Sequence, residues 1–291
     1  SCTKVARFLS RRLITHGNPT RVIALKGVLS QDHNGWGLAA NNPNLFDRLR
    51  TNQKQTVVWP RYGAMKYRCV ATSIEGFVQQ LVSCYLPHGY WFCVSGRIPQ
   101  RKKPSDVDQR LIWKYGIDVS RQTRARQKLA GKASMHYLRY ERIFVLLATH
   151  GQHPFFENEN KNIRDVRRIP IRLDGYSISV KQGGYRRKVS RDDPAIPDNK
   201  WRVRVQIDRE HYRDLRAYFL DMALRRTADQ LADDLYHVPF EPYAPVRQQM
   251  LNILRLVNKA RKAAGKETVS PQVLRYRRRI VRPFERMALD D

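Results

Sequence analysis

Acidic side chains are scarce in this sequence. Only 26 Asp and Glu stand against 55 Lys and Arg, so the formal net charge is +29. A folded chain tolerates self-repulsion on that scale most easily when a polyanion neutralises it. The charge therefore predicts nucleic acid, RNA or DNA, as the partner, with an acidic membrane or protein surface as the alternative. The 5 Trp, 14 Tyr and 10 Phe exclude a disordered basic tail, which would lack such side chains.

Cysteine is also rare. Cys2, Cys69, Cys84 and Cys93 are scattered along the chain, and no CxxC pair exists. A zinc finger or zinc ribbon needs closely spaced ligand pairs, so the spacing argues against this class. Few, scattered cysteines fit a reducing compartment.

Long hydrophobic runs are missing. None approaches the roughly 20 residues of a membrane-spanning helix, and no secretory signal peptide is visible. We therefore expect an intracellular protein of the cytoplasm or nucleoid, with no membrane partner. Residues 1–31 lack Asp and Glu and contain Arg7, Arg11 and Arg12. Because organellar transit peptides share this composition, an organelle matrix stays open as a further location.

Several common catalytic motifs are absent as well. The sequence contains no P-loop, no GxSxG and no GxGxxG, which argues against P-loop NTPases, α/β-hydrolases and dinucleotide-dependent enzymes. The leading hypothesis is accordingly a non-catalytic protein that needs no cofactor.

Hydrophobic periodicity predicts an α+β fold with a mixed sheet. "MKYRCVAT" alternates like a strand, "SIEGFVQQLVSCYL" has one apolar helical face with Ser73 as N-cap, and "YWFCVSG" is a second strand. This order predicts a β-α-β unit, interpreted as ferredoxin-like. Further strands are expected in 135–149 and at "RRIPIRL", "YSISV" and "KWRVRVQI".

The chain is expected to divide into three regions. Residues 1–64 form an irregular basic N-terminal region. Residues 65–207 form the α+β nucleic-acid-binding core, with a basic helical insert at 99–134. Residues 208–291 are helical, as a separate domain or as a layer on the same sheet, and "SPQVLRYRRRIVRPFERM" is expected to be the last helix, beginning at Ser270-Pro271.

Charge is unevenly distributed between these regions. Residues 97–142 hold 13 Lys and Arg against 4 acids, and residues 255–286 hold 11 against 2. Residues 208–241 instead hold 5 against 8. A polyanion is therefore expected to contact the insert and the C-terminal segment, while the acidic stretch serves as scaffold.

Local patterns identify candidate nucleic-acid-binding side chains. In "WRVRVQI", strand alternation places Arg202, Arg204 and Gln206 on one face and the apolar residues on the other. Tyrosines among basic residues suit stacking on unpaired bases, which favours RNA over DNA within a ribonucleoprotein or nucleoprotein assembly that contains other proteins. The candidates are Arg101, Lys102, Lys103, Arg121, Arg124, Lys128, Tyr185, Arg186, Arg187, Arg202, Arg204, Arg275, Tyr276, Arg277, Arg278 and Arg279, of which Tyr185 and Tyr276 are expected to be exposed.

An alternative function is a metal-dependent endonuclease of a mobile element. "THGQHPFFENEN" places His150, His153 and Glu157 close together after an apolar run, where they could hold Mg²⁺ or Mn²⁺. Tyr212 or Tyr218, on a later predicted helix, could act as a nucleophile. The His-x-His motif of such tyrosine endonucleases is missing, so we interpret the stretch as a buried strand that ends at a polar turn.

A second alternative is a helix-turn-helix DNA-binding protein. The two short helices expected between 105 and 132 flank "YGID", and one of them would read a groove. Arg121, Arg124 and Lys128 recur at spacings of three and four, so they are expected to share one face of the second helix.

Overall fold

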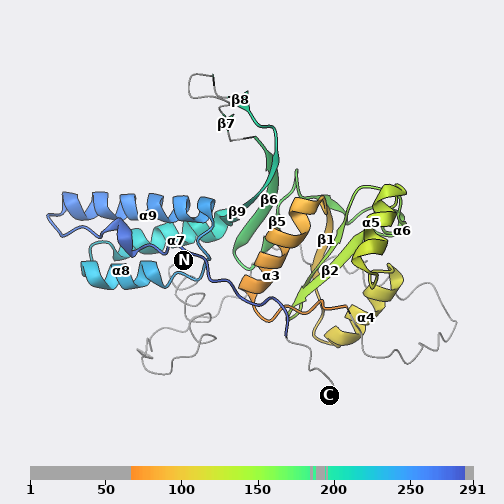
Figure 1. Ribbon diagram of the computed structural model, residues 1–291. Coiled ribbons are helices and arrows are strands. Elements are labelled where there is room, and N and C mark those ends of the chain that lie inside the picture. Colours follow the sequence, from red (N-terminus) through yellow and green to blue (C-terminus); the bar gives the residue numbers. More distant parts are fainter. Residues whose placement is uncertain (1–66, 184–185, 188–193, 195, 286–291) are drawn as a thin grey trace, which may run out of the picture. The chain divides into compact units, whose positions relative to one another are not determined.

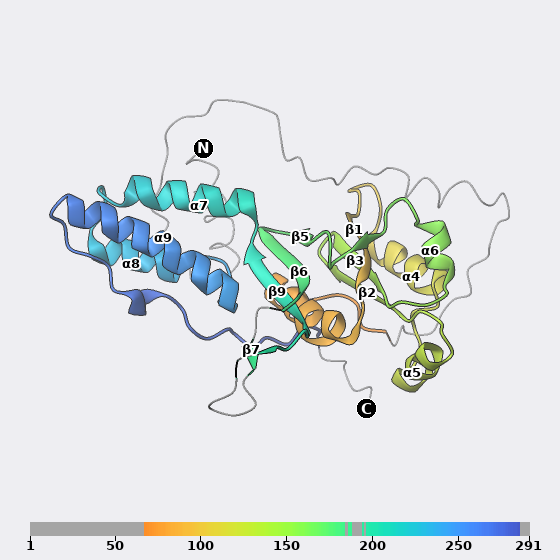
Figure 2. The same cartoon turned by 90° about the horizontal axis from the view of Figure 1, so that it is seen from above.

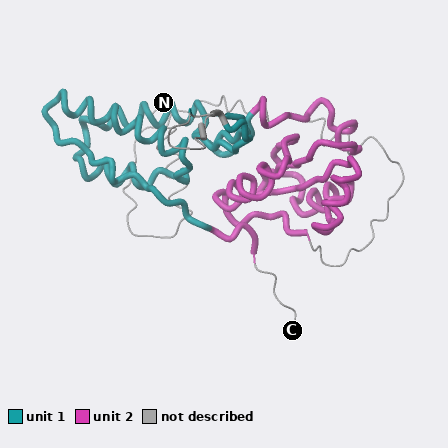
Figure 3. The backbone as a smooth tube through the Cα atoms, turned by 45° about the horizontal axis from the view of Figure 1, so that its top comes forward, with its two compact units in different colours: residues 1–29, 170–280 teal, residues 30–169, 281–291 magenta. Residues whose placement is uncertain are grey.

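The computed structural model describes residues 67–183, 186–187, 194 and 196–285 (Figure 1). The predicted N-terminal region 1–64 and Tyr185 lie outside this part. The described chain divides into two compact units, residues 170–280 (unit 1) and residues 67–169 with 281–285 (unit 2) (Figure 3). The expected boundary between 207 and 208 falls inside unit 1.

Unit 2 is built on an antiparallel sheet. Its strands β1 (Phe92–Arg97), β2 (Met135–Tyr140), β3 (Ile143–Ala148) and β4 (Arg164–Asp165) follow the order β2-β3-β1-β4. All three strand pairs are antiparallel. The apolar run that precedes "THGQH" is β3, the central strand that the sequence predicted to be buried.

Helices cover both faces of this sheet. Side chains such as Tyr137, Phe144 and Leu146 form one core with α4 (Pro104–Lys114), which contributes Leu111 and Ile112. On the opposite face, α3 (Ile74–Gln80) packs beside β2 (Figure 1, Figure 2). Strand alternation makes this two-sided burial possible, since neighbouring residues point to opposite faces.

The β-α-β prediction is correct for its helix and second strand. The Ser73 side chain accepts a hydrogen bond from the Gly76 N–H at 3.1 Å and caps α3 as expected. The first strand is reduced to one parallel bridge between Val70 and Arg139 of β2. Two strands, β2 and β3, lie between that bridge and β1, and the ferredoxin-like interpretation is not confirmed.

The insert at 99–134 contains the two expected helices, α4 and α5 (Arg121–Leu129). Ser120 caps α5, since its hydroxyl accepts from the Thr123 N–H at 3.1 Å. The pattern "SDVDQRLIWKYG" predicts Ser105 as the N-cap of the first helix, which is wrong: Lys103 is the N-cap and Pro104 already occupies the first helical turn, a position that the fixed φ of proline suits. A short helix, α6 (Pro154–Asn158), follows β3.

Unit 1 contains a second antiparallel sheet in the order β5-β6-β9, from β5 (Ile171–Leu173), β6 (Tyr176–Gln182) and β9 (Trp201–Ile207). Gly175 makes the tight β5–β6 turn with φ +83, and a Cβ there would lie 2.9 Å from the Phe240 ring. Glycine is required here for both conformational and steric reasons. A small hairpin, β7 (Arg186–Arg187) with β8 (Ile196–Pro197), extends from the long loop.

Three helices complete unit 1 and form a bundle at one end of this sheet (Figure 1, Figure 2). They are α7 (Arg209–Met222), α8 (Ala228–Tyr236) and α9 (Ala244–Ala263). Asp208 and Thr227 cap the first two, the latter in a capping box with Gln230. None of the helices in the described part of the chain has the length and apolar character needed to cross a membrane.

The expected last helix is wrong. Ser270 caps a turn as predicted, but that turn is a single 3-10 turn, Pro271–Val273. Residues 274–285 then continue without helix or strand. The side chains that impose this extended course belong to the candidate interface described below.

In unit 2, the side chain of one histidine is surrounded by the rings of three tyrosines. The His136 ring stacks on Tyr85 at 4.3 Å and lies 4.7 Å from Tyr90, measured between centroids. Its Nδ1 is 2.9 Å from the Tyr67 hydroxyl. Burial, with a further contribution from the positive charges of Arg124 and Lys128, lowers the pKa of His136 to about 3.

This lowered pKa predicts that the folded protein loses stability in acid. Below about pH 6.5 the unfolded chain binds a proton at His136, whereas the folded chain stays neutral there down to about pH 3. The free energy of unfolding should therefore fall as the pH drops through this window, by up to about 4 to 5 kcal/mol. Urea denaturation of wild type and His136→Asn between pH 7 and pH 3.5 measures the difference.

The variant should lose less stability on acidification than wild type. His237→Asn, at an exposed histidine on unit 1, is the control and should follow the wild-type profile. If His136→Asn and wild type lose equal amounts of stability on acidification, His136 is not the source of the acid sensitivity.

Candidate nucleic-acid interface

One face of the unit 1 sheet is polar and basic. The register pairs Lys181 with Arg202, Ser179 with Arg204, and Ser177 with both Gln206 and Arg172. Because the side chains of directly paired residues share a face, strands β5, β6 and β9 bring one set together. We call it the basic sheet face, and it consists of Arg172, Ser177, Ser179, Lys181, Arg202, Arg204 and Gln206.

The opposite face of this sheet is apolar. Ile178, Val180, Val205 and Ile207 are buried, and Tyr176 packs edge-on against Phe240 with centroids 5.0 Å apart. The alternation predicted for β9 is therefore present, although Trp201 at its start is exposed. Sequence reasoning missed Arg172 and Lys181, because only strand pairing brings them beside Arg204.

Like charges meet on the basic sheet face. Lys181 and Arg202 are directly opposite each other, an arrangement that destabilises a strand pair. The Arg202 guanidinium hydrogen-bonds Asp198, which lowers the pKa of that carboxyl to about 2. Arg172 lies 3.4 Å from Asp208 between Nε and Oδ1. Asp208 and Asp198 thus orient Arg172 and Arg202 on this face.

A second basic surface is the segment 274–280, which we call the C-terminal strap. The buried Glu241 carboxylate fixes it at two points, since Oε1 lies 3.4 Å from an Arg275 nitrogen and Oε2 accepts from the Arg279 N–H at 2.9 Å. Arg275 also donates to the carbonyls of Val238 and Phe240, each at 2.7 Å. In a continuing helix the Arg279 N–H would bond the Arg275 carbonyl instead, so this anchoring excludes the predicted helix.

From Tyr276 onward the strap turns its side chains outward. Arg277, Arg278 and Arg279 are exposed, and Tyr276 is 78% exposed, as the sequence predicted. Arg247 of α9 lies over the Tyr276 ring at 4.4 Å, and Arg278 over the Tyr243 ring at 4.6 Å. Arg275, predicted to bind phosphate, is instead half-buried and serves as an anchor.

Two of the side chains predicted to bind phosphate instead hold helix α5 against other parts of the protein. Arg124 donates to the Ile117 carbonyl at 2.6 Å and lies over the Tyr67 ring. Lys128 donates to the His88 carbonyl at 3.3 Å, and burial lowers its pKa. Both therefore contact the protein itself, and Arg121 is on the exposed surface.

No side chain of α5 is buried. The helix therefore contributes nothing to the packed core that joins the two helices of a helix-turn-helix motif. Its exposed residues are Arg121, Gln122, Thr123, Ala125, Arg126, Lys128 and Leu129.

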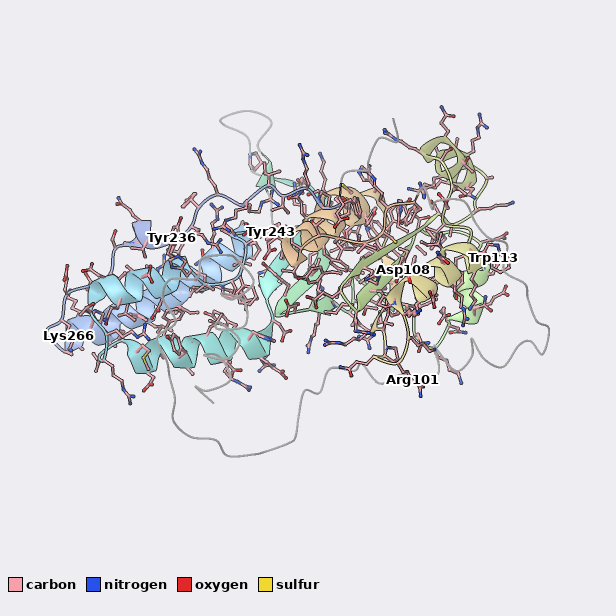
Figure 4. All side chains as sticks on the ribbon, turned by 90° about the horizontal axis from the view of Figure 1, so that it is seen from below. Arg101, Asp108, Trp113, Tyr236, Tyr243 and Lys266 are labelled. Carbon is pink, nitrogen blue, oxygen red and sulfur yellow. The ribbon has the colours of Figure 1, made fainter. Side chains whose placement is uncertain are left out.

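The loop that carries Arg101, Lys102 and Lys103 is organised by an arginine that sequence reasoning missed. The Arg142 guanidinium donates to the carbonyls of Pro99 at 2.7 Å and of Gln100 and Lys102 at 3.2 Å each. Arg101 and Lys103 are exposed, and Arg101 lies on the periphery of unit 2 (Figure 4). Arg142 lies in the tight turn between β2 and β3.

The residues proposed for a nuclease have structural contacts. His153 caps α6, since its Nδ1 accepts from the Phe155 N–H at 3.0 Å, and burial lowers its pKa. His150 and Glu157 are exposed. The neighbouring Glu159 is buried and accepts from the Tyr115 hydroxyl at 2.6 Å.

The two tyrosines named as nucleophiles belong to unit 1, whereas the histidines belong to unit 2. Tyr212 is half-buried, and the buried Tyr218 has its hydroxyl 3.5 Å from Asp234. Within the described ranges, no group of three or more His, Cys, Asp and Glu side chains is placed to hold a metal ion.

Arg186 and Arg187 are placed only by their backbone, which forms β7 in the hairpin with β8. They belong to the segment "KQGGYRRKVSRDDPAIPDN", which the sequence predicts as a long loop between the strands β6 and β9.

Comparison with known protein families, with curated proteins and with solved structures found no match for this chain. Function is therefore inferred from the geometry of the two basic surfaces.

The anchoring of the strap gives a direct test. Glu241→Ala leaves the half-buried Arg275 guanidinium without its carboxylate, which should lower the free energy of unfolding by about 2 to 4 kcal/mol. The released strap should also be cleaved faster by trypsin after Arg277, Arg278 or Arg279. Chemical denaturation and timed proteolysis followed by mass spectrometry measure the two effects.

Asp229→Ala, which removes an exposed acid from α8, is the matched control and should change neither quantity. If Glu241→Ala has the same stability and the same rate of trypsin cleavage as wild type, Glu241 does not hold the strap.

Proposed function

We propose that this protein is a non-catalytic nucleic-acid-binding component of a ribonucleoprotein or nucleoprotein assembly, with RNA as the favoured polymer. The observation that carries the proposal is the register that aligns Arg172, Lys181, Arg202 and Arg204 on one sheet face. Phosphates would neutralise this face and relieve its internal repulsion. The net charge of +29 supplies the general attraction.

RNA is favoured over DNA because unpaired bases in RNA loops are free to stack on exposed side chains. Several tyrosines that lie among basic residues, such as Tyr115 and Tyr137, are buried and unavailable. Tyr276 and Trp113 are the exposed rings that support stacking in this proposal, at 78% and 55% exposure.

Salt dependence tests the role of the sheet face. Arg204→Gln should lower affinity and reduce the slope of log K against log salt by about 0.7 to 0.9, the contribution of one phosphate contact. Fluorescence anisotropy with labelled single-stranded and duplex RNA and DNA, at salt concentrations from low to physiological, gives the slope for each polymer.

Arg216→Gln removes an equal charge from the exposed surface of α7, among the acidic residues of unit 1, and is the matched control. It should leave the slope unchanged. If wild-type binding does not depend on salt, the phosphate-neutralisation account fails altogether.

A second candidate function, reading of duplex DNA by α5, is favoured by the exposure of most residues of that helix, none of which is fully buried. Gln122 and Arg126 are exposed and are of the residue types that pair with adenine and guanine edges in the major groove. The helix would then enter the groove alone, not as half of a packed helix pair.

Selection from random duplexes tests this candidate. A selected site should bind more tightly than its scrambled version, and Gln122→Ala with Arg126→Ala should abolish that preference, since each hydrogen-bonded base pair read by a side chain is worth about 1 to 3 kcal/mol. Equal competition by scrambled DNA would remove the candidate.

The endonuclease alternative stays a prediction, and the capping role of His153 in α6 does not favour it. Denaturing gels of the same probes with Mg²⁺ or Mn²⁺ and with EDTA would detect cleavage. His153→Ala would then show whether the "THGQH" turn takes part.

A further inference from the structure

We propose that the C-terminal strap selects unpaired nucleic acid, with one unpaired base stacked on Tyr276 and the flanking phosphates neutralised by Arg277, Arg278 and Arg279. This inference rests on the proposed function and narrows it to a substrate class. The sheet face needs only phosphates, which every nucleic acid has. The strap additionally requires a base that has one face not covered by a neighbouring base.

The Tyr276 ring offers one face to a ligand. Its other face is covered by the Arg247 guanidinium, 4.4 Å from the ring centroid, and Arg247 belongs to the long helix α9. The ring is nevertheless 78% exposed, so a base has room on the uncovered side. An aromatic platform of this kind accepts any base, because every base has a π face.

The backbone holds this platform in place. Glu241 fixes the strap on both sides of Tyr276, through the Arg275 side chain and the Arg279 N–H. Ordering a free segment on binding would cost conformational entropy. Because the strap is already held in place before it binds, it loses less conformational entropy on binding, which favours affinity.

Three exposed arginines directly follow the stacking position in the chain. Two residues of extended chain span at most about 7 Å, so the backbones of Arg277 and Arg279 lie within that distance of each other. Their side chains are exposed and can reach phosphates on either side of one nucleotide. The guanidinium geometry suits phosphate oxygens, which it binds with paired hydrogen bonds.

A duplex does not satisfy the stacking requirement. Each base in a duplex is already covered by its neighbours, and a side chain that stacks on it must first separate them. The strap can still contact duplex phosphates, and its contribution there is electrostatic. Tyr276 should therefore matter for single strands and not for duplexes.

The test compares three probes by fluorescence anisotropy at one salt concentration. They are a thymidine strand about 12 nucleotides long, the same strand with every base replaced by an abasic site, and a blunt duplex of equal length. Wild type should bind the thymidine strand more tightly than the abasic strand by roughly 5- to 150-fold, the range expected for one stacked base.

Tyr276→Leu should lose most of the preference for the thymidine strand and bind the duplex like wild type; any remaining preference should disappear when Trp113, the other exposed ring named above, is also changed to Leu. Tyr276→Phe should keep the wild-type preference, because stacking requires the ring and not the hydroxyl. Tyr236→Leu is the matched control, since Tyr236 is a 49% exposed tyrosine on α8, apart from Tyr243 and the start of α9 (Figure 4). It should behave like wild type. Circular dichroism melting confirms that each variant is folded.

The outcomes separate this inference from the proposed function. If Tyr276→Leu retains the preference for the thymidine strand while binding stays salt-dependent, the strap inference is overturned and phosphate binding stands. The same holds if wild type binds the abasic strand as tightly as the thymidine strand. If no probe is bound at any salt concentration, both proposals fail.

Discussion

The shortage of acidic partners for a large number of cations is the constraint on which this structure depends. With 26 acids for 55 Lys and Arg, most cations cannot have a carboxylate of their own. The buried acids therefore have clear organising roles. Asp108 accepts from Arg139 and from the Tyr137 hydroxyl inside unit 2, and Glu241 fixes two points of the strap in unit 1. Removing one such acid leaves a cation or a hydroxyl without a partner in a buried place, which costs more than an exposed pair is worth.

The same constraint explains the composition of the candidate interface. The arginines that receive acids or carbonyls, such as Arg275 and Arg142, become anchors that shape the backbone. Exposed cations such as Arg277 and Arg101 lie on the outer surface of the segments so shaped. Structural and functional arginines are thus interleaved along the chain, and a count of positive charge cannot separate them.

This interleaving limits how much could be predicted from the sequence. Periodicity identified β3, α3, β9 and α9, because burial of one face leaves a pattern of period two or 3.6 in the residues. It failed for residues 274–285, because "SPQVLRYRRRIVRPFERM" begins with a helix cap, whereas the interaction that decides its course is with Glu241, more than thirty residues away. It also failed for Arg124 and Lys128, whose spacing correctly indicates one helix face but not that this face rests on the rings of Tyr67 and Tyr90. Only part of the basic sheet face could be predicted. The alternation of β9 is evident in the sequence, whereas its register with the other strands of the sheet is not.

Aromatic rings take over part of the role that acids would otherwise have. Arg124, Lys128, Arg247 and Arg278 each lie over a ring, at distances between 4.4 and 5.7 Å. A ring attracts a cation through its quadrupole without neutralising it. An arginine held by a carboxylate must exchange that partner before it binds phosphate, whereas an arginine held by a ring keeps its full charge and its hydrogen-bond donors. Side chains such as Arg247 and Arg278 are therefore oriented and still fully charged, which is the state that a surface built to bind a polyanion requires.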